Sequence, residues 1–75
     1  MVVTADHATI GLTAIEQSMT LEITDITGRI LLSEKVGAGA TQIGINTASL
    51  RTGLYIYRLV SNGRVLDAKR MQIVK

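Results

Sequence analysis

The stretch GLYIYRLVSNGR, residues 53–64, indicates how this chain folds. In it Tyr55, Tyr57 and Leu59 recur at every second position, the spacing that places side chains on one face of a β-strand. The pair Asn62-Gly63 follows and precedes a second apolar run, which is the strongest short-range signal for a two-residue hairpin. The stretch therefore predicts a β-hairpin whose first strand covers Gly53–Val60.

Short runs of alternating apolar and polar residues recur along the rest of the chain, separated by turn residues. The other runs predicted as strands are Thr9–Ile15, Met19–Asp25, Arg29–Val36, Thr41–Asn46 and Val65–Val74. A short turn at Thr47–Thr52 is expected to bring Leu50 to the core. Such a series of short strands is typical of a sandwich or barrel.

The composition also favours strands over helices. Val, Ile and Thr account for 24 of the 75 residues, against 7 Ala, and Phe and Trp are absent. β-Branched side chains lose rotamer freedom in helices and pack well on pleated sheets. We therefore predict a small all-β domain, an immunoglobulin-like antiparallel β-sandwich of six or seven strands.

One motif resembles the tyrosine corner of that fold, in which the tyrosine hydroxyl bonds to upstream backbone. The motif is Leu50-x-x-Gly53-x-Tyr55.

The turn Asp25-Ile26-Thr27-Gly28 predicts how the second hairpin pairs. Asp at the first position and Gly at the fourth suit a type I turn closed by a left-handed glycine. In that register Asp25 faces Arg29, and Ile23 faces Leu31. We expect Gly28, and likewise Gly53, to be a left-handed or close-approach glycine.

Strict counting from the Asn-Gly turn puts Arg58 opposite Asp67 as a charged cross-strand pair. The same count puts Met71 and Ile73 on the opposite face from the apolar residues of the preceding strand. Because both sets suit the core, we expect a β-bulge within Asp67–Arg70 that shifts the phase.

The net charge of +2 is unevenly distributed along the chain. Residues 1–50 hold two cations and five carboxylates, whereas residues 51–75 hold six cations and one carboxylate. This asymmetry fits either an anionic partner or a solvated face that protects an edge strand.

The residues needed for several kinds of site are missing. The chain has no cysteine and one histidine, His7, so no zinc site of thiolates and imidazoles can form. Nothing in the sequence resembles the nucleophile elbow of a serine triad. Asp25 and Asp67 already have structural roles, which argues against a pair of catalytic carboxylates. Two tyrosines in core phase give no platform for nucleic acid, and no apolar run of 18 residues exists for membrane insertion. We predict a module that is not an enzyme, with no catalytic residue, cofactor or metal.

Three blocks of sequence resemble a known family. They are Leu21-x-Ile23-x-Asp25-x-x-Gly28-Arg29-x-Leu31, then Ile45-Asn46-Thr47-Ala48-Ser49-Leu50-Arg51-Thr52-Gly53-Leu54-Tyr55, and finally Asn62-Gly63-Arg64 with Lys69–Lys75. In this order they resemble the C-terminal sorting domain of the type IX secretion system, type A, also called the Por secretion tail. The resemblance covers residues 19–75. Residues 1–18 are expected to be an opening strand or linker, because the family usually opens with Pro-Asn-Pro and this chain has no proline.

The resemblance implies that the domain is a secretion address for an upstream cargo in the same chain. In Bacteroidota-type bacteria such a cargo crosses the periplasm and is exported by an outer-membrane translocon. A surface transpeptidase then usually removes the tail, which leaves the cargo at the cell surface or outside the cell. The alternative is an immunoglobulin-like adhesion or interaction module at the end of a surface protein.

The final strand is the expected recognition surface. The residues assigned to it are Lys69, Arg70, Met71, Ile73, Val74 and Lys75. An edge strand with unpaired backbone groups could also pair with a partner strand or form a dimer.

Overall fold

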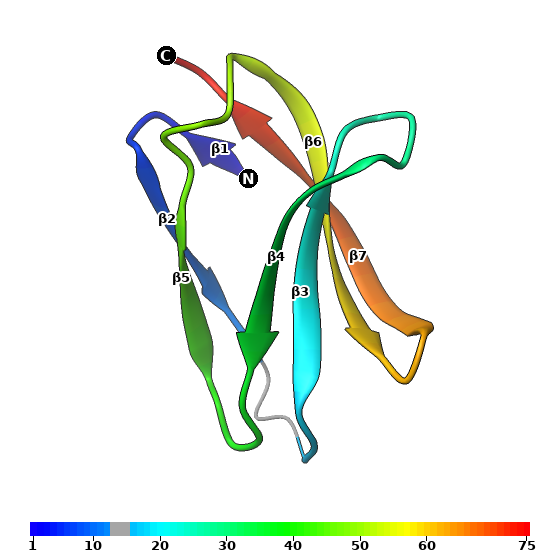
Figure 1. Ribbon diagram of the computed structural model, residues 1–75. Coiled ribbons are helices and arrows are strands. Elements are labelled where there is room, and N and C mark those ends of the chain that lie inside the picture. Colours follow the sequence, from blue (N-terminus) through cyan, green and yellow to red (C-terminus); the bar gives the residue numbers. More distant parts are fainter. Residues whose placement is uncertain (13–15) are drawn as a thin grey trace.

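The computed structural model describes residues 1–12 and 16–75, and these form seven β-strands and no helix (Figure 1). The strands are β1 (Val2–Val3), β2 (His7–Gly11), β3 (Met19–Thr24), β4 (Ile30–Val36), β5 (Gln42–Asn46), β6 (Gly53–Ser61) and β7 (Arg64–Ile73). The prediction of an all-β chain is confirmed. The run predicted as Thr9–Ile15 corresponds to β2, and its end, residues 13–15, lies outside the described residues.

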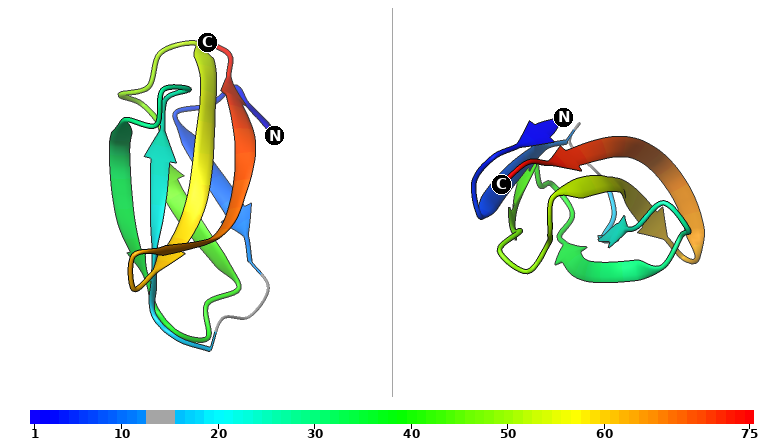
Figure 2. Two further views of the ribbon diagram at one scale, coloured as in Figure 1. Left: turned by 90° about the vertical axis from the view of Figure 1, so that its right-hand side faces the viewer. Right: turned by 90° about the horizontal axis from the view of Figure 1, so that it is seen from above.

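The strands form a small sandwich of two sheets. The larger sheet has the order β1-β7-β6-β3-β4, and the smaller one pairs β2 with β5. Seen from above, the larger sheet is strongly curved and the smaller one lies to one side of it (Figure 2). All pairs are antiparallel except β1–β7, which is parallel. The predicted antiparallel sandwich is therefore correct apart from this one short pair.

The core lies between the two sheets and is built from inward-facing residues of every strand. Its buried members are Val3, Ala8, Ile10, Leu21, Ile23, Val36, Ile45, Leu50, Tyr55, Met71 and Ile73. Three of them come from the first ten residues, so β1 and β2 are integral to the packing. Leu50 reaches the core from the loop before β6, as expected, and Ile43, Tyr57 and Leu59 pack against its edge.

The β3–β4 hairpin contains a bulge that we did not predict. Asp25 faces Arg29 as expected, since the Asp25 N–H donates to Arg29 O at 3.0 Å. Ile23, however, pairs with Leu32 and not with Leu31. Strict alternation would turn one of the two adjacent leucines away from the core, whereas the bulge lets both pack against it.

The β6–β7 hairpin turns at Asn62-Gly63, as predicted. Both residues have positive φ, 51° and 74°, and Ser61 pairs with Arg64 across a two-residue turn. Positive φ at both central positions matches the right-handed twist of the flanking strands.

A bulge is also present in this hairpin, but it lies earlier than expected. The register shifts between Leu59 and Val60, and the pairing over Asp67–Arg70 is unbroken, so the predicted position was wrong. The bulge still has the expected effect, because it brings Met71 opposite Tyr55 in the core.

The early bulge also changes the partner of Arg58. Arg58 lies opposite Ala68, so the predicted pair with Asp67 was wrong. On its other side it lies opposite Glu22 of β3, and its Nε donates to Glu22 Oε1 at 2.7 Å. The bulge lets Arg58 pair with the neighbouring strand, and the Asp67 carboxylate accepts the Ala68 N–H instead.

Candidate functional site

The three sequence blocks lie at defined places in the fold. The ends of β3 and β7 and the start of β6 meet at one end of the larger sheet, since Thr24 pairs with Ile56 and Gly53 pairs with Ile73 (Figure 1). The Asp25 turn, the corner before β6 and the chain terminus therefore share that end. The Asn-Gly turn lies at the opposite end.

Asp25 organises its turn through three donors. Its Oδ1 accepts the Thr27 hydroxyl at 2.5 Å, the Thr27 N–H at 2.9 Å and the Arg29 N–H at 3.0 Å. The Gly28 N–H donates to Asp25 O at 3.1 Å, and Gly28 has φ +92°, which confirms the left-handed glycine. The Thr27 hydroxyl is the largest cause that lowers the pKa of Asp25 below its ordinary value. Desolvation, the next largest, opposes it, and the Arg29 and Thr27 amides and the Arg29 charge add to the lowering. The carboxylate thus holds the turn closed.

The tyrosine corner forms as predicted. The Tyr55 hydroxyl donates to Arg51 O at 2.7 Å, which ties the start of β6 to the loop that precedes it. Leu50 is buried beside it in the core. These contacts explain why leucine and tyrosine stand at this spacing.

The expectation for Gly53 was wrong. Its φ is not in the left-handed region, and a Cβ would lie 3.8 Å from Tyr55 Cε2 and 3.9 Å from Arg51 O, which are ordinary contacts. The close approach occurs at Gly44, where a Cβ would lie 3.0 Å from Nε2 of the exposed His7. The pairing of β2 with β5 places these two residues near each other, and nothing local in the sequence signals it.

The terminal strand divides into buried and exposed positions. Met71 and Ile73 are fully buried, so their side chains contribute to the core and not to the surface. Lys69, Arg70 and Val74 are exposed. The end of the strand is not an open edge, because β1 pairs with Gln72 and Ile73 there.

Lys75 holds together three separate parts of the chain. Its Nζ donates to Thr47 O at 3.0 Å and to Ala48 O at 3.1 Å, and it lies 3.1 Å from Asp6 Oδ1. Its N–H also donates to Thr52 Oγ1 at 3.0 Å. The side chain retains 28% of its exposure. The last cation of the sequence therefore anchors the terminus to the β5–β6 loop.

Thr47 is a structural residue that our sequence reasoning did not identify. It is fully buried, its hydroxyl donates to Ala5 O at 3.0 Å, and its N–H donates to Asp6 O at 2.8 Å. It belongs to the second sequence block, three residues before Leu50. Its position in that block was the available signal, although nothing local indicated a partner 42 residues away.

Residues 1–12 and 16–75 contain no group of three or more His, Asp or Glu side chains placed to bind a metal ion. In the same residues, no helix is long and apolar enough to cross a membrane. The candidate functional features are therefore the turns built by the sequence motifs and the terminal strand.

A comparison with known families identifies the kind of domain. The family model described as secretion system C-terminal sorting domain matches residues 4–74. The chain belongs to the type IX secretion C-terminal sorting domain family. The match begins before β2, and so includes residues for which the three blocks gave no support. No significant match was found to a curated protein or to a solved structure.

A type IX sorting domain is a signal and not a catalytic unit. It acts together with the type IX secretion machinery on a cargo in the same chain, and it marks a secreted protein that passes to the cell surface or beyond. In this sorting domain the three family blocks build the Asp25 turn, the tyrosine corner, and a hairpin that ends in the anchored terminus.

Proposed function

We propose that this sorting domain directs an upstream cargo through the outer-membrane translocon of a type IX system. The cargo would first reach the periplasm by a leader of its own. A surface transpeptidase would then remove the domain and couple the cargo to an anionic lipopolysaccharide. The family match over residues 4–74 is the observation that carries this proposal.

Within the domain, we propose that the machinery reads β7 and the charges of Lys69 and Arg70. Both side chains are exposed, and neither has an ion-pair partner among the residues described. Val74, directly after the strand, is also exposed. Lys75 would contribute mainly by fixing the end of the strand, because its ammonium group is already held by two carbonyls and Asp6.

A reporter fusion tests the proposed function. A reporter with a cleavable N-terminal leader is fused to residues 1–75 and expressed in a bacterium with a type IX system, and in the same strain without its translocon. Residues 1–18 are included because Val3, Ala8 and Ile10 belong to the core. We expect the reporter outside the cell only when the translocon is present. Retention in the periplasm of both strains would contradict the proposal and would favour an adhesion or interaction module.

The role of the β7 charges is tested separately with a matched pair of double variants. Lys69→Gln/Arg70→Gln removes two exposed cations from β7, and Lys35→Gln/Arg51→Gln removes two exposed cations elsewhere. Exposed substitutions usually change stability by less than about 0.5 kcal/mol, so both proteins should melt like wild type. We expect export to fall only in the β7 variant. Equal export of the two variants would show that these cations are not read.

A further inference from the structure

The edge of β7 is open over most of its length. β6 pairs with it along one side, from Arg64 to Ile73. On the other side, the partner that the described residues provide is β1, which covers only Gln72 and Ile73. An edge strand with free backbone groups is a template for pairing with another chain.

The contacts with β1 show which backbone groups face this edge. Gln72 N–H donates to Met1 O at 2.8 Å, and Val74 N–H donates to Val3 O at 2.9 Å. Because strand residues alternate in the side to which their N–H and C=O point, the groups of Ala68 and Arg70 face the same edge. β1 ends before it reaches them. The Ala68 N–H donates to the exposed Asp67 carboxylate at 3.0 Å, so the groups in line with the ladder that β1 begins are the Ala68 C=O and the N–H and C=O of Arg70.

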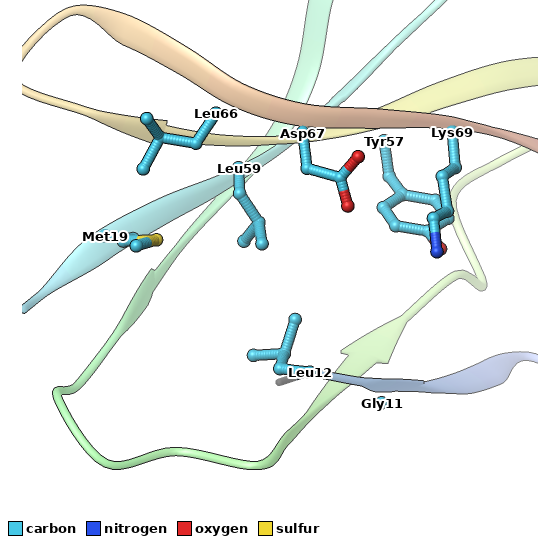
Figure 3. Close-up of a pocket in the computed structure, with 8 residues that line it drawn as sticks. All are labelled: Gly11, Leu12, Met19, Tyr57, Leu59, Leu66, Asp67 and Lys69. Atoms are coloured by element: carbon cyan, nitrogen blue, oxygen red, sulfur yellow. The ribbon is translucent and has the colours of Figure 1, made fainter. Parts of the chain in front are cut away.

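A cleft lies directly inside this stretch of β7. It has a volume of about 230 Å³ and opens between the β6–β7 hairpin and the end of β2. Tyr57, Leu59 and Leu66 line it from the hairpin, and Leu12 faces them from the other side (Figure 3). Leu66 is 46% exposed. Asp67 and Lys69 of β7 also line the cleft, so its wall is mixed, with leucine and tyrosine side chains beside one carboxylate and one ammonium group (Figure 3). A strand added beside β7 would direct every second side chain toward this cleft.

The positive charge of β7 favours an acidic partner over a second copy of the chain. β7 carries three cations, Arg64, Lys69 and Arg70, against one carboxylate, Asp67. A second copy would bring the same cations together in a paired edge, and like charges directly opposite are destabilising. An acidic strand would instead be attracted by them.

We infer that the open edge of β7 binds an extended acidic segment of a partner protein by strand addition at Ala68 and Arg70. Apolar side chains of that segment enter the cleft, and the carboxylates that alternate with them lie on the face of Arg70. Main-chain hydrogen bonds supply affinity, and the alternating side chains supply specificity. This inference rests on the proposed function, because the partner belongs to the secretion machinery.

Peptide binding to the purified 75-residue chain tests the inference. The probe is a fluorescent eight-residue peptide in which glutamate alternates with valine, and its control replaces every glutamate with lysine. We expect the acidic peptide to bind at least tenfold more tightly and to weaken as salt is added. Added peptide should also slow amide hydrogen exchange at Arg70. Equal affinity for the two peptides, or no binding at millimolar peptide, would overturn the inference.

A proline substitution tests the geometry. Ala68→Pro replaces the outward N–H, which donates to the Asp67 carboxylate in the free domain, with a ring that blocks an added strand. The bonds to β6 remain, and proline is tolerated at a strand edge that faces solvent. We expect at least a tenfold loss of affinity, whereas Ala68→Ser, an exposed change that keeps the N–H, should bind like wild type. If Ala68→Pro fails to melt cooperatively, Lys69→Gln/Arg70→Gln replaces it, with the same expected loss. Unchanged binding by the folded variant would overturn strand addition.

The two proposals fail in different ways. Loss of translocon-dependent export by the wild-type reporter contradicts the proposed function. Normal export by Ala68→Pro, together with absent peptide binding, overturns the edge inference alone.

Discussion

Replacing Tyr55 with phenylalanine isolates the hydrogen bond that closes the tyrosine corner. The ring is buried, with 9% of its surface exposed, and its hydroxyl donates to Arg51 O at 2.7 Å. Tyr55→Phe keeps the ring in the core and removes only this bond. Tyr55→Ala would also remove the buried ring, at about 3–5 kcal/mol. A chain of this size has roughly 4–11 kcal/mol of stability at about 0.05–0.15 kcal/mol per residue, so the alanine variant would lose a large share of it and would not separate the bond from the ring.

The expected cost of Tyr55→Phe follows from the net value of one hydrogen bond. A typical intramolecular hydrogen bond contributes about 0.5–1.5 kcal/mol, because the unfolded chain bonds to water instead. In a domain of this length each kcal/mol shifts the melting temperature by roughly 4–8 °C. We therefore expect a loss of about 1 kcal/mol and a melting temperature lower by several degrees.

Tyr57→Phe is the matched control. Tyr57 lies two residues further along β6, is half-buried, and its hydroxyl makes no hydrogen bond within residues 1–12 and 16–75. Both variants are measured by thermal and urea unfolding, followed by circular dichroism. Tyr57→Phe should change the free energy of unfolding by less than about 0.5 kcal/mol. If the two variants lose the same stability, the corner bond does not contribute and the argument is wrong.

Three further predictions concern the turns and the terminus. Gly28→Ala should destabilise the domain by about 1 kcal/mol or more, because φ is +92° there, whereas Gly53→Ala should be neutral or stabilising by up to about 1 kcal/mol. Both variants are measured by urea unfolding, and an equal loss of stability would contradict the claim that only Gly28 needs a left-handed conformation. Because the pKa of Asp25 is lowered in the folded state, its contribution is complete above its ordinary value of 3.8 and is lost as the pH falls through the folded value. The difference in melting temperature between wild type and Asp25→Asn should therefore shrink below that pH, and a constant difference would refute the role of the charge. Lys75→Gln should cost about 1 kcal/mol in the same unfolding assay, since its ammonium group binds two carbonyls and keeps 28% exposure; an unchanged midpoint would show that the terminus is not anchored.

The anchored terminus also affects how secretion variants are designed. Neutralising Lys75 together with Lys69 and Arg70 would mix a folding effect with a recognition effect. Deleting residues 73–75 would remove the fully buried Ile73, and so would unfold the domain. The double variant of Lys69 and Arg70 avoids both problems.

The sequence alone determined the features that depend on neighbouring residues. The Asn62-Gly63 turn needs positive φ at two adjacent positions, and the Asp25 turn needs a carboxylate and a left-handed glycine three residues apart. The tyrosine corner joins residues four positions apart. Period-two alternation then assigned strands to the larger sheet, because each face of a strand meets either core or solvent. The motifs also led to the correct family.

Tertiary structure decided everything that joins distant segments. Ile23 pairs with Leu32, and Arg58 pairs with Glu22, because two bulges fit the apolar residues of several strands into one core. A local pattern cannot place a bulge, since the residue that is displaced depends on what the opposite sheet must bury. The parallel strand β1 and the anchor of Lys75 likewise arise only when the two ends of the chain meet. The open part of the β7 edge, and the cleft beside it, follow from where β1 and β2 end in space, which no spacing along the chain records.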